Sequence, residues 1–209
     1  MKRIHHFFWV LTLFTAILTG EPALAAEKEN NSAGPSQIVA AFHESLLDVM
    51  KNAKALGIKG RYEKLAGRIE QTFHLGLMAR ISTGSYWKKA TQTETDTLAA
   101  AFSRLSISTY ASQFDGYSGQ SFKTHGEKPG PQNTTLVKTQ IIDPGSDPVD
   151  ITYVTRKIKG QWKVIDVLLD TGISELAVRR SEYRRILKTG GIKGLIGTLN
   201  AKADQLLNE

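Results

Sequence analysis

Apolar residues recur at helical spacing through the first half of the chain, beginning with the stretch from Ile38 to Met50. Ser36 stands in front of this stretch, where a helix N-cap is expected, and Gly57 is expected to end the helix. Further apolar stripes of the same period predict helices that begin at about Arg61, Phe73 and Thr93. The first half of the chain is therefore predicted to be helical.

After Gly116 the apolar period changes to two, which is typical of β-strands. Short turns containing proline or glycine separate the runs, and strands joined by such turns pair antiparallel. The predicted strands are residues 118–126, 133–142, 149–158 and 161–169. Ser174 is then expected to cap a helix that breaks at Gly190-Gly191. This order predicts an α+β domain, a four-stranded antiparallel meander with N- and C-terminal helices packed on one face.

The first residues have the order of a Sec signal peptide. Lys2 and Arg3 precede an apolar stretch that is short for a membrane span, and Ala23-Leu24-Ala25 follows as a small-residue cleavage site. We expect residues 1–25 to be removed on export, with an uncleaved anchor as the alternative. Residues 26–36 are polar and are predicted to form a flexible lead-in, and residues 37–209 are predicted to form a single domain.

The composition excludes several classes of protein. The chain has no cysteine, which excludes a disulfide scaffold and thiolate metal sites. Its net charge of +7 would attract it to anionic lipid surfaces or acidic partners. Nucleic acid is not an expected partner, because the lysines and arginines are not interleaved with stacking aromatic residues.

The sequence offers little for metal binding or hydrolysis. Outside the signal peptide the histidines are His43, His74 and His125, on three different predicted elements and without an H-x-H or H-E-x-x-H pair. Each is interpreted as a surface or structural histidine, so no metal and no cofactor are assigned. Neither a G-x-S-x-G elbow nor a G-K-[ST] phosphate loop occurs.

Asp166 is a candidate residue for acid–base chemistry. It lies in the apolar run WKVIDVLLD, in phase with Trp162, Val164 and Leu168, and is expected to point toward the covered face of the sheet. There it could serve as the general base of a small enzyme. The preferred interpretation is a carboxylate that pairs with an arginine or caps backbone amides, because no second catalytic group is visible. No catalytic residue is assigned.

Apolar side chains are abundant in both halves of the predicted domain, and most of them must form the core. A cupped sheet with helices over it can nevertheless leave an apolar cavity between the layers, suited to a lipid. The candidates for lining such a cavity are Leu77, Met78, Phe102, Leu105, Phe114, Val137, Ile141, Val154, Val164 and Leu168.

The segment DTGISELAVRRSEYRRIL contains a cluster of arginines. Glu175 and Glu182 stand at helical spacing from Arg179, so part of the positive charge is compensated within the helix. Arg180 and Arg184 form an uncompensated pair four positions apart, which mildly repels. We therefore expect this pair to face a lipid headgroup or a docking partner.

The same region carries a family resemblance. The segment GQWKVIDVLLDTGISELAVRRSEYRRILKTGGIKGLIGTL resembles the C-terminal signature of the MlaC-type (toluene-tolerance) periplasmic lipid-binding proteins, and FHLGLMARISTGSYWKKATQTE is similar to an upstream segment of that family. The resemblance covers essentially the whole chain after the signal peptide. Within it, the segment DTGISELAVRRSEY is most similar to the hopanoid-associated HpnM branch of the family.

The resemblance implies an NTF2-like fold with an apolar pocket that takes lipid tails and leaves the headgroup outside. It further implies a carrier of phospholipid or hopanoid in the periplasm of a Gram-negative bacterium. Such a carrier docks on an inner-membrane ABC transporter complex and on an outer-membrane lipid system, with transient membrane contact. A small NTF2-like enzyme using Asp166 as general base, or an adaptor of a membrane complex that carries no cargo, remains the alternative.

Overall fold

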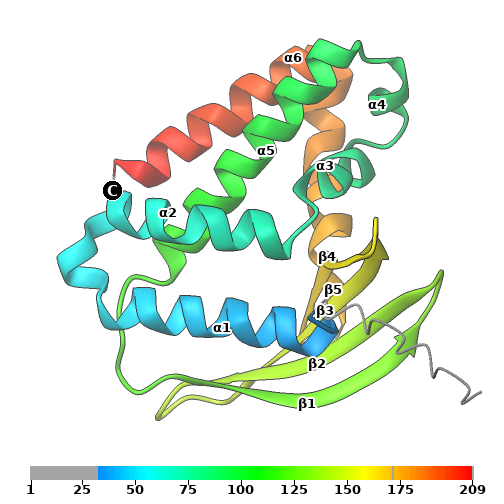
Figure 1. The fold of residues 1–209 in the computed structure, drawn as a ribbon. Coiled ribbons are helices and arrows are strands. Elements are labelled where there is room, and N and C mark those ends of the chain that lie inside the picture. The colour runs from blue at the N-terminus through cyan, green and yellow to red at the C-terminus, as the bar shows by residue number, and fades with distance from the viewer. Residues whose placement is uncertain (1–32, 171, 209) are drawn as a thin grey trace, which may run out of the picture. The chain divides into compact units, whose positions relative to one another are not determined.

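The structure, a computed structural model, describes residues 33–170 and 172–208, so the expected signal peptide and most of the expected lead-in lie outside the described residues. Helices occupy the first half of the described chain and its C-terminal end, with a sheet between them (Figure 1). The helices are α1 (Pro35–Lys51), α2 (Ala53–Thr72), α3 (Leu75–Thr83), α4 (Ser85–Lys89), α5 (Gln92–Gln113) and α6 (Glu175–Leu207). In these ranges no helix combines the length and the apolar character that a membrane crossing requires.

The helix boundaries differ from the prediction, most clearly at α1, α2 and α5. Helix α1 begins one residue before Ser36, with Gly34 as N-cap and proline as its first residue, a position that proline favours. Gly57 does not end a helix but kinks α2, with φ of 60° and ψ of 179°. The cap of α5 is Thr91, whose hydroxyl accepts from the backbone amide of Glu94 in a capping box, and not Thr93.

The described strands form one antiparallel sheet in the order β1-β2-β3-β4-β5. The strands are β1 (Ser121–Gly130), β2 (Thr134–Ile142), β3 (Val149–Ile158), β4 (Gln161–Leu169) and β5 (Ile173–Ser174). The α+β class is confirmed, and β3 and β4 have the predicted bounds. The prediction of four strands is wrong, because the chain pairs once more with β4 through two residues immediately before α6.

A β-bulge in β4 changes which of its side chains face the helices. Val154 pairs with Asp166, whereas the next residue of β3, Thr155, pairs with Val164, so β4 contains one extra residue at this point. An extra residue reverses the alternation of side chains beyond it. Val164 and Val167, three positions apart, accordingly both belong to the core.

The core lies between the sheet and the helices that cover it (Figure 1). Phe42 of α1 is fully buried and packs edge-on against Phe73 and Tyr110, with ring centroids 5.0 and 5.3 Å apart. Helix α6 leaves the edge of the sheet, kinks at Gly191 where φ is 60°, and returns alongside α5. The predicted break at this glycine pair is confirmed. The kink gives α6 two halves that both pack against α5.

Candidate functional site

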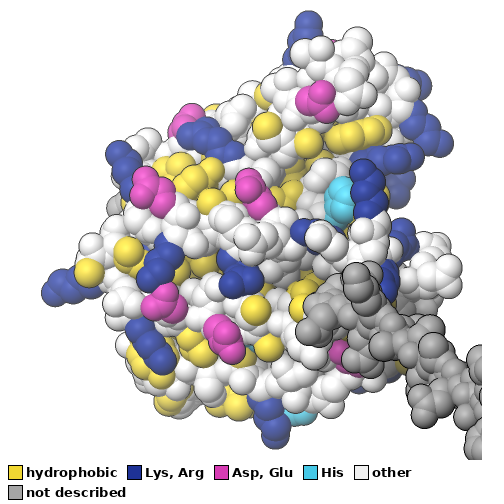
Figure 2. All heavy atoms as spheres, in the orientation of Figure 1, with side chains coloured by type: hydrophobic (Ala, Val, Ile, Leu, Met, Phe, Trp, Pro, Cys, Tyr) yellow, Lys and Arg dark blue, Asp and Glu magenta, His cyan; other side chains and the backbone are white. Residues whose placement is uncertain are grey.

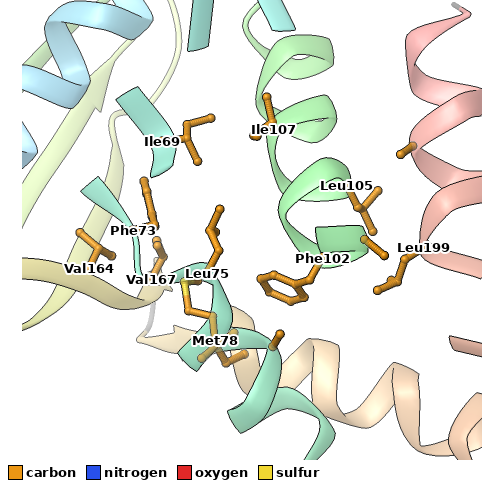
Figure 3. Close-up of a cluster of buried hydrophobic side chains, with 14 of the residues drawn as sticks. Ile69, Phe73, Leu75, Met78, Phe102, Leu105, Ile107, Val164, Val167 and Leu199 are labelled. Atoms are coloured by element: carbon orange, nitrogen blue, oxygen red, sulfur yellow. The ribbon is translucent and has the colours of Figure 1, made fainter. Parts of the chain in front are cut away.

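A cavity of about 250 Å³ lies between the sheet and the helices. The end of α2, helix α3, helix α5 and strand β1 supply aromatic and aliphatic side chains to its wall. Figure 3 shows those from the end of α2, from α3 and from Phe102 of α5 converging. These residues are Phe73, Leu75, Met78, Phe102, Phe114 and Phe122. The wall is therefore predominantly apolar, as ligand pockets commonly are.

The sheet closes the cavity on the opposite side. Ile151 and Tyr153 of β3 and Val167 and Leu169 of β4 line this side, and the two pairs are partners in the sheet register. The bulge brings Val167 and Leu169 to the cavity in place of Leu168 and Asp166. The floor is thus made by a strand face that simple alternation from Val164 does not predict.

Polar residues interrupt the apolar wall, among them two on the inner face of α5. Ser106 and Tyr110 stand on successive turns of α5, and both line the cavity. Within the described part of the chain, neither side chain makes a hydrogen bond to the protein. Both hydroxyl groups can therefore meet a polar atom of a ligand, beside the other polar residues of the lining, Thr109, Gln113, Glu175 and Arg179.

A buried histidine packs against two residues of the cavity wall. His43 of α1 is 4% exposed, stacks on Phe122 with ring centroids 4.0 Å apart, and its Nε2 lies 2.9 Å from the hydroxyl oxygen of Tyr153. Burial lowers the pKa of His43 to about 4. At neutral pH the ring is uncharged, and it fixes two residues of the cavity wall.

The candidates from the sequence fall into three groups. Met78, Phe102 and Phe114 line the cavity. Leu105, Val137 and Val164 are buried in the core around it without lining it. Leu77, Ile141, Val154 and Leu168 are only partly buried and lie outside the cavity wall.

The predicted phase of β4 was wrong. Leu168 and Asp166 were expected to share the covered face with Val164, but the bulge turns them to the opposite face. Val154, the register partner of Asp166, lies on that opposite face as well.

The sequence candidates include none of the sheet residues of the wall and neither of its charged residues, Glu175 and Arg179. Ile151 and Tyr153 share a strand face, but Val154 beside them is equally apolar, so the pattern favours neither face of β3. Arg179 also lines the cavity, with its guanidinium 5.6 Å from the centre of the Phe102 ring. A signal for Arg179 was present, because it stands three positions after Leu176 and four before Tyr183, inside the apolar stripe of α6.

Asp166 has a structural role. One carboxylate oxygen, Oδ1, accepts hydrogen bonds from the backbone amides of Val167 and Leu176, and Oδ2 accepts one from the Ser174 hydroxyl at 2.6 Å. Ser174 in turn accepts from the amide of Ala177, as the predicted cap of α6. The preferred interpretation, capping of backbone amides, is confirmed, and the carboxylate joins β4 to the start of α6.

Replacing Asp166 by asparagine should lower the free energy of unfolding by roughly 1–2 kcal/mol. The amide offers one acceptor oxygen in place of two, and it removes a negative charge from the start of a helix. Urea unfolding measures this difference. Asp150→Asn is the matched control, because Asp150 is exposed and its carboxylate accepts from the Gln140 side chain. Equal stability of Asp166→Asn and wild type would contradict the capping role.

Arg180 and Arg184 do not reach the cavity. They line a separate hollow of about 220 Å³ together with Lys188 and the turn between α3 and α4. Arg180 lies against this turn, since a Cβ placed on Gly84 would be 3.3 Å from its Nη2. The predicted pair therefore shares a surface, on a different side of α6 from Arg179.

The other histidines are accounted for by the fold or by exposure. His74 caps α3, its Nδ1 accepting from the backbone amide of Leu77 at 3.1 Å, and His125 is exposed on β1. Among residues 33–170 and 172–208, no three histidine, aspartate or glutamate side chains gather in a way that could hold a metal ion.

Comparison with known proteins shows the family of this chain and a solved structure with a similar fold. Residues 40–201 match the family model described as MlaC protein. The fold is also similar to that of the phospholipid-binding protein from Ralstonia solanacearum, solved in complex with a phospholipid. The TM-score is 0.73 at 21% sequence identity, over 83% of this chain and 99% of that one. Because the family model spans most of the chain, the protein belongs to the MlaC family.

Proposed function

We propose that this protein is a periplasmic lipid carrier, which shields the tails of a phospholipid or hopanoid in the cavity and shuttles the lipid between the inner and outer membranes. The observation that carries the proposal is the apolar cavity between the sheet and the helices. Membership of the MlaC family and the similarity in fold to a phospholipid-binding protein support it.

The energetics favour a dedicated cavity for such a cargo. Each buried CH₂ group contributes about 0.8 kcal/mol, so a tail of about ten buried methylenes gains roughly 8 kcal/mol, enough for micromolar affinity. The cavity volume of about 250 Å³ lies slightly below the range of about 300–1,000 Å³ common for ligand pockets. A cargo with two tails must therefore displace part of the wall or extend beyond it.

The proposed contacts to the tails come from the wall itself. Met78 and Phe102 contact the tails from the helices, and Phe114 does so at the end of α5. Met78 is unbranched and adapts its shape readily, which suits a wall that must move. The other candidates from the sequence lie in the surrounding core or outside the cavity wall.

Arg180 and Arg184 are proposed to dock the carrier on its inner-membrane transporter complex. The hollow that they line shares no residue with the cavity, so they do not adjoin a headgroup there. Basic side chains gather at the α4 end of the molecule, as Figure 2 shows, and α4 itself ends with Lys88 and Lys89. A basic surface of this kind suits an acidic partner.

Changing Arg180 and Arg184 together to alanine should weaken binding to the transporter complex by about tenfold and leave the lipid content unchanged. Binding of the purified variant to the complex, measured by surface plasmon resonance, provides the test. Arg185→Ala is the control, because Arg185 is exposed on the same helix and lies outside this hollow. Unchanged docking of the double variant would refute this assignment.

Several finer assignments are part of the proposal. The resemblance of residues 170–183 to the HpnM branch makes hopanoid a candidate cargo beside phospholipid. The partners are the inner-membrane transporter complex and the outer-membrane lipid system, reached by transient membrane contact. The NTF2-like description of the fold and the signal peptide stay predictions from the sequence.

Transfer of lipid between vesicles tests the carrier activity. The protein is mixed with donor vesicles containing a fluorescent phospholipid and with acceptor vesicles held apart by size. Transfer that increases in proportion to protein concentration is the expected result. Transfer no faster than without protein would contradict the carrier and favour an adaptor that carries no cargo.

A further inference from the structure

A groove adjoins the cavity on the side of α6. It runs between α5 and the two halves of α6, with a volume of about 420 Å³. Thr109 and Gln113 from α5, with Glu175 and Arg179 from α6, line both the groove and the cavity. The two spaces are therefore neighbours, with these side chains at their border.

The groove has two charged residues that the cavity lacks, Glu182 and Lys202. Glu175, Arg179 and Glu182 stand at helical spacing along the first half of α6, and Lys202 belongs to the second half. All of them line the groove, which gives it two cations and two carboxylates over an apolar floor that includes Leu199. The lining thus carries charges of both signs in equal number.

These charges form no ion pairs with one another, so the compensation of Arg179 by Glu175 and Glu182 that the sequence predicts is wrong. In the described ranges, ion pairs join Lys64 to Asp48 and Arg104 to Asp204, and neither pair belongs to the groove. Four charged side chains that line one groove without pairing have free capacity for charged groups of a ligand.

Neutral groups hold Arg179 in place. Its guanidinium lies over the Phe102 ring, and its Nη1 is 3.5 Å from the hydroxyl oxygen of Tyr183. Burial raises the pKa of the Tyr183 hydroxyl, Arg179 lowers it, and Glu182 raises it again. A positive and a negative charge therefore act on the same hydroxyl at the edge of the groove.

We propose that this groove binds the headgroup of a zwitterionic phospholipid whose tails occupy the neighbouring cavity. Arg179 and Lys202 bind the phosphate, and Glu175 and Glu182 bind an ammonium group. The inference rests on the lipid-carrier function proposed above and narrows its cargo to lipids that join a phosphate to an amine.

The balance of charge in the groove favours this class over others. A headgroup with a phosphate alone would leave both carboxylates unpaired beside it, and a lipid without charge would leave all four side chains unpaired. A zwitterionic headgroup satisfies both signs. The border residues let one molecule span both spaces, which also provides room that the cavity of about 250 Å³ lacks.

Competition between lipids with identical tails tests the inference. The protein freed of lipid is incubated with vesicles containing equal amounts of phosphatidylethanolamine, phosphatidylglycerol and diacylglycerol, and bound lipid is identified by native mass spectrometry. Phosphatidylethanolamine should exceed phosphatidylglycerol by about tenfold. Arg179→Gln should reduce both phospholipids by about tenfold relative to diacylglycerol, and Arg179→Lys should restore part of the loss.

Two more variants separate recognition from a loss of folding. Lys202 is exposed, so Lys202→Gln leaves the core intact, and it should reduce both phospholipids by about threefold. A Glu175→Gln/Glu182→Gln double variant should bind about tenfold less phosphatidylethanolamine, which brings it to the level of phosphatidylglycerol. Arg185→Gln, outside the groove, is the control and should match wild type.

The outcomes distinguish this inference from the carrier function. Equal binding of all three lipids by wild type, or an equal loss of all three in Arg179→Gln, would overturn the headgroup site and leave the carrier intact. Binding of none of the three lipids by wild type would overturn the headgroup site and would also exclude phospholipid as the cargo of the proposed carrier.

Discussion

Replacing Ser106 by phenylalanine should empty the protein of lipid while leaving it folded. Ser106 is 7% exposed and lines the cavity from α5. A phenyl ring at this position fills space that the lipid tail needs, so bound lipid should fall by at least about tenfold. The lipid-free variant should gain about 1 kcal/mol in the free energy of unfolding, because the ring buries apolar surface in an existing cavity.

The same ring on the outside of α5 provides the control. Ala100 is exposed, so Ala100→Phe adds the ring without entering the cavity. Bound phospholipid per protein molecule is measured by extraction and phosphate assay for both variants. A folded Ser106→Phe protein that retains the lipid content of wild type would show that the cargo lies elsewhere.

Acidification should remove about 3 kcal/mol from the free energy of unfolding through His43 alone. The pKa of His43 is lowered from 6.5 to about 4 by burial. Since the folded state holds the proton less tightly than the unfolded state, stability is complete above pH 6.5 and is lost as the pH falls toward 4. Protonation replaces the neutral ring that stacks on Phe122 and contacts Tyr153 by a buried cation, so the folded state is destabilised.

Urea unfolding at a series of pH values isolates this contribution. His43→Gln keeps a polar group that can reach the Tyr153 hydroxyl but cannot titrate. The difference in stability between wild type and variant should therefore shrink by about 3 kcal/mol between pH 6.5 and pH 4. His125→Gln, at an exposed position, should leave the pH dependence unchanged. A difference that stays constant with pH would mean that His43 is not a buried neutral group.

The order of elements could be predicted from the sequence because each element has a local signal. Turns at Lys159-Gly160 and around Pro144 separate runs of period two, and β2 and β3 end where these turns begin. Ser174 followed by an acidic first turn marks the start of α6 in the same way.

The cavity wall could be predicted only in part, because its composition depends on pairing between distant residues. The bulge before Asp166 has no signature in the run WKVIDVLLD, yet it decides that Val167 and not Leu168 faces the helices. Strand β5 is two residues long, too short for a periodic pattern. The choice between Arg179 and Arg180 depends on how α6 is rotated against α5, which packing sets.

The measurement that tests the central claim most directly is native mass spectrometry of the mature protein purified from a Gram-negative periplasm, followed by organic extraction and lipid analysis. A lipid carrier should show a stoichiometric added mass that is recovered in the extract as phospholipid or hopanoid, and that is lost in Ser106→Phe. A protein that carries no added mass when it is purified from lipid-rich cells would contradict the carrier function.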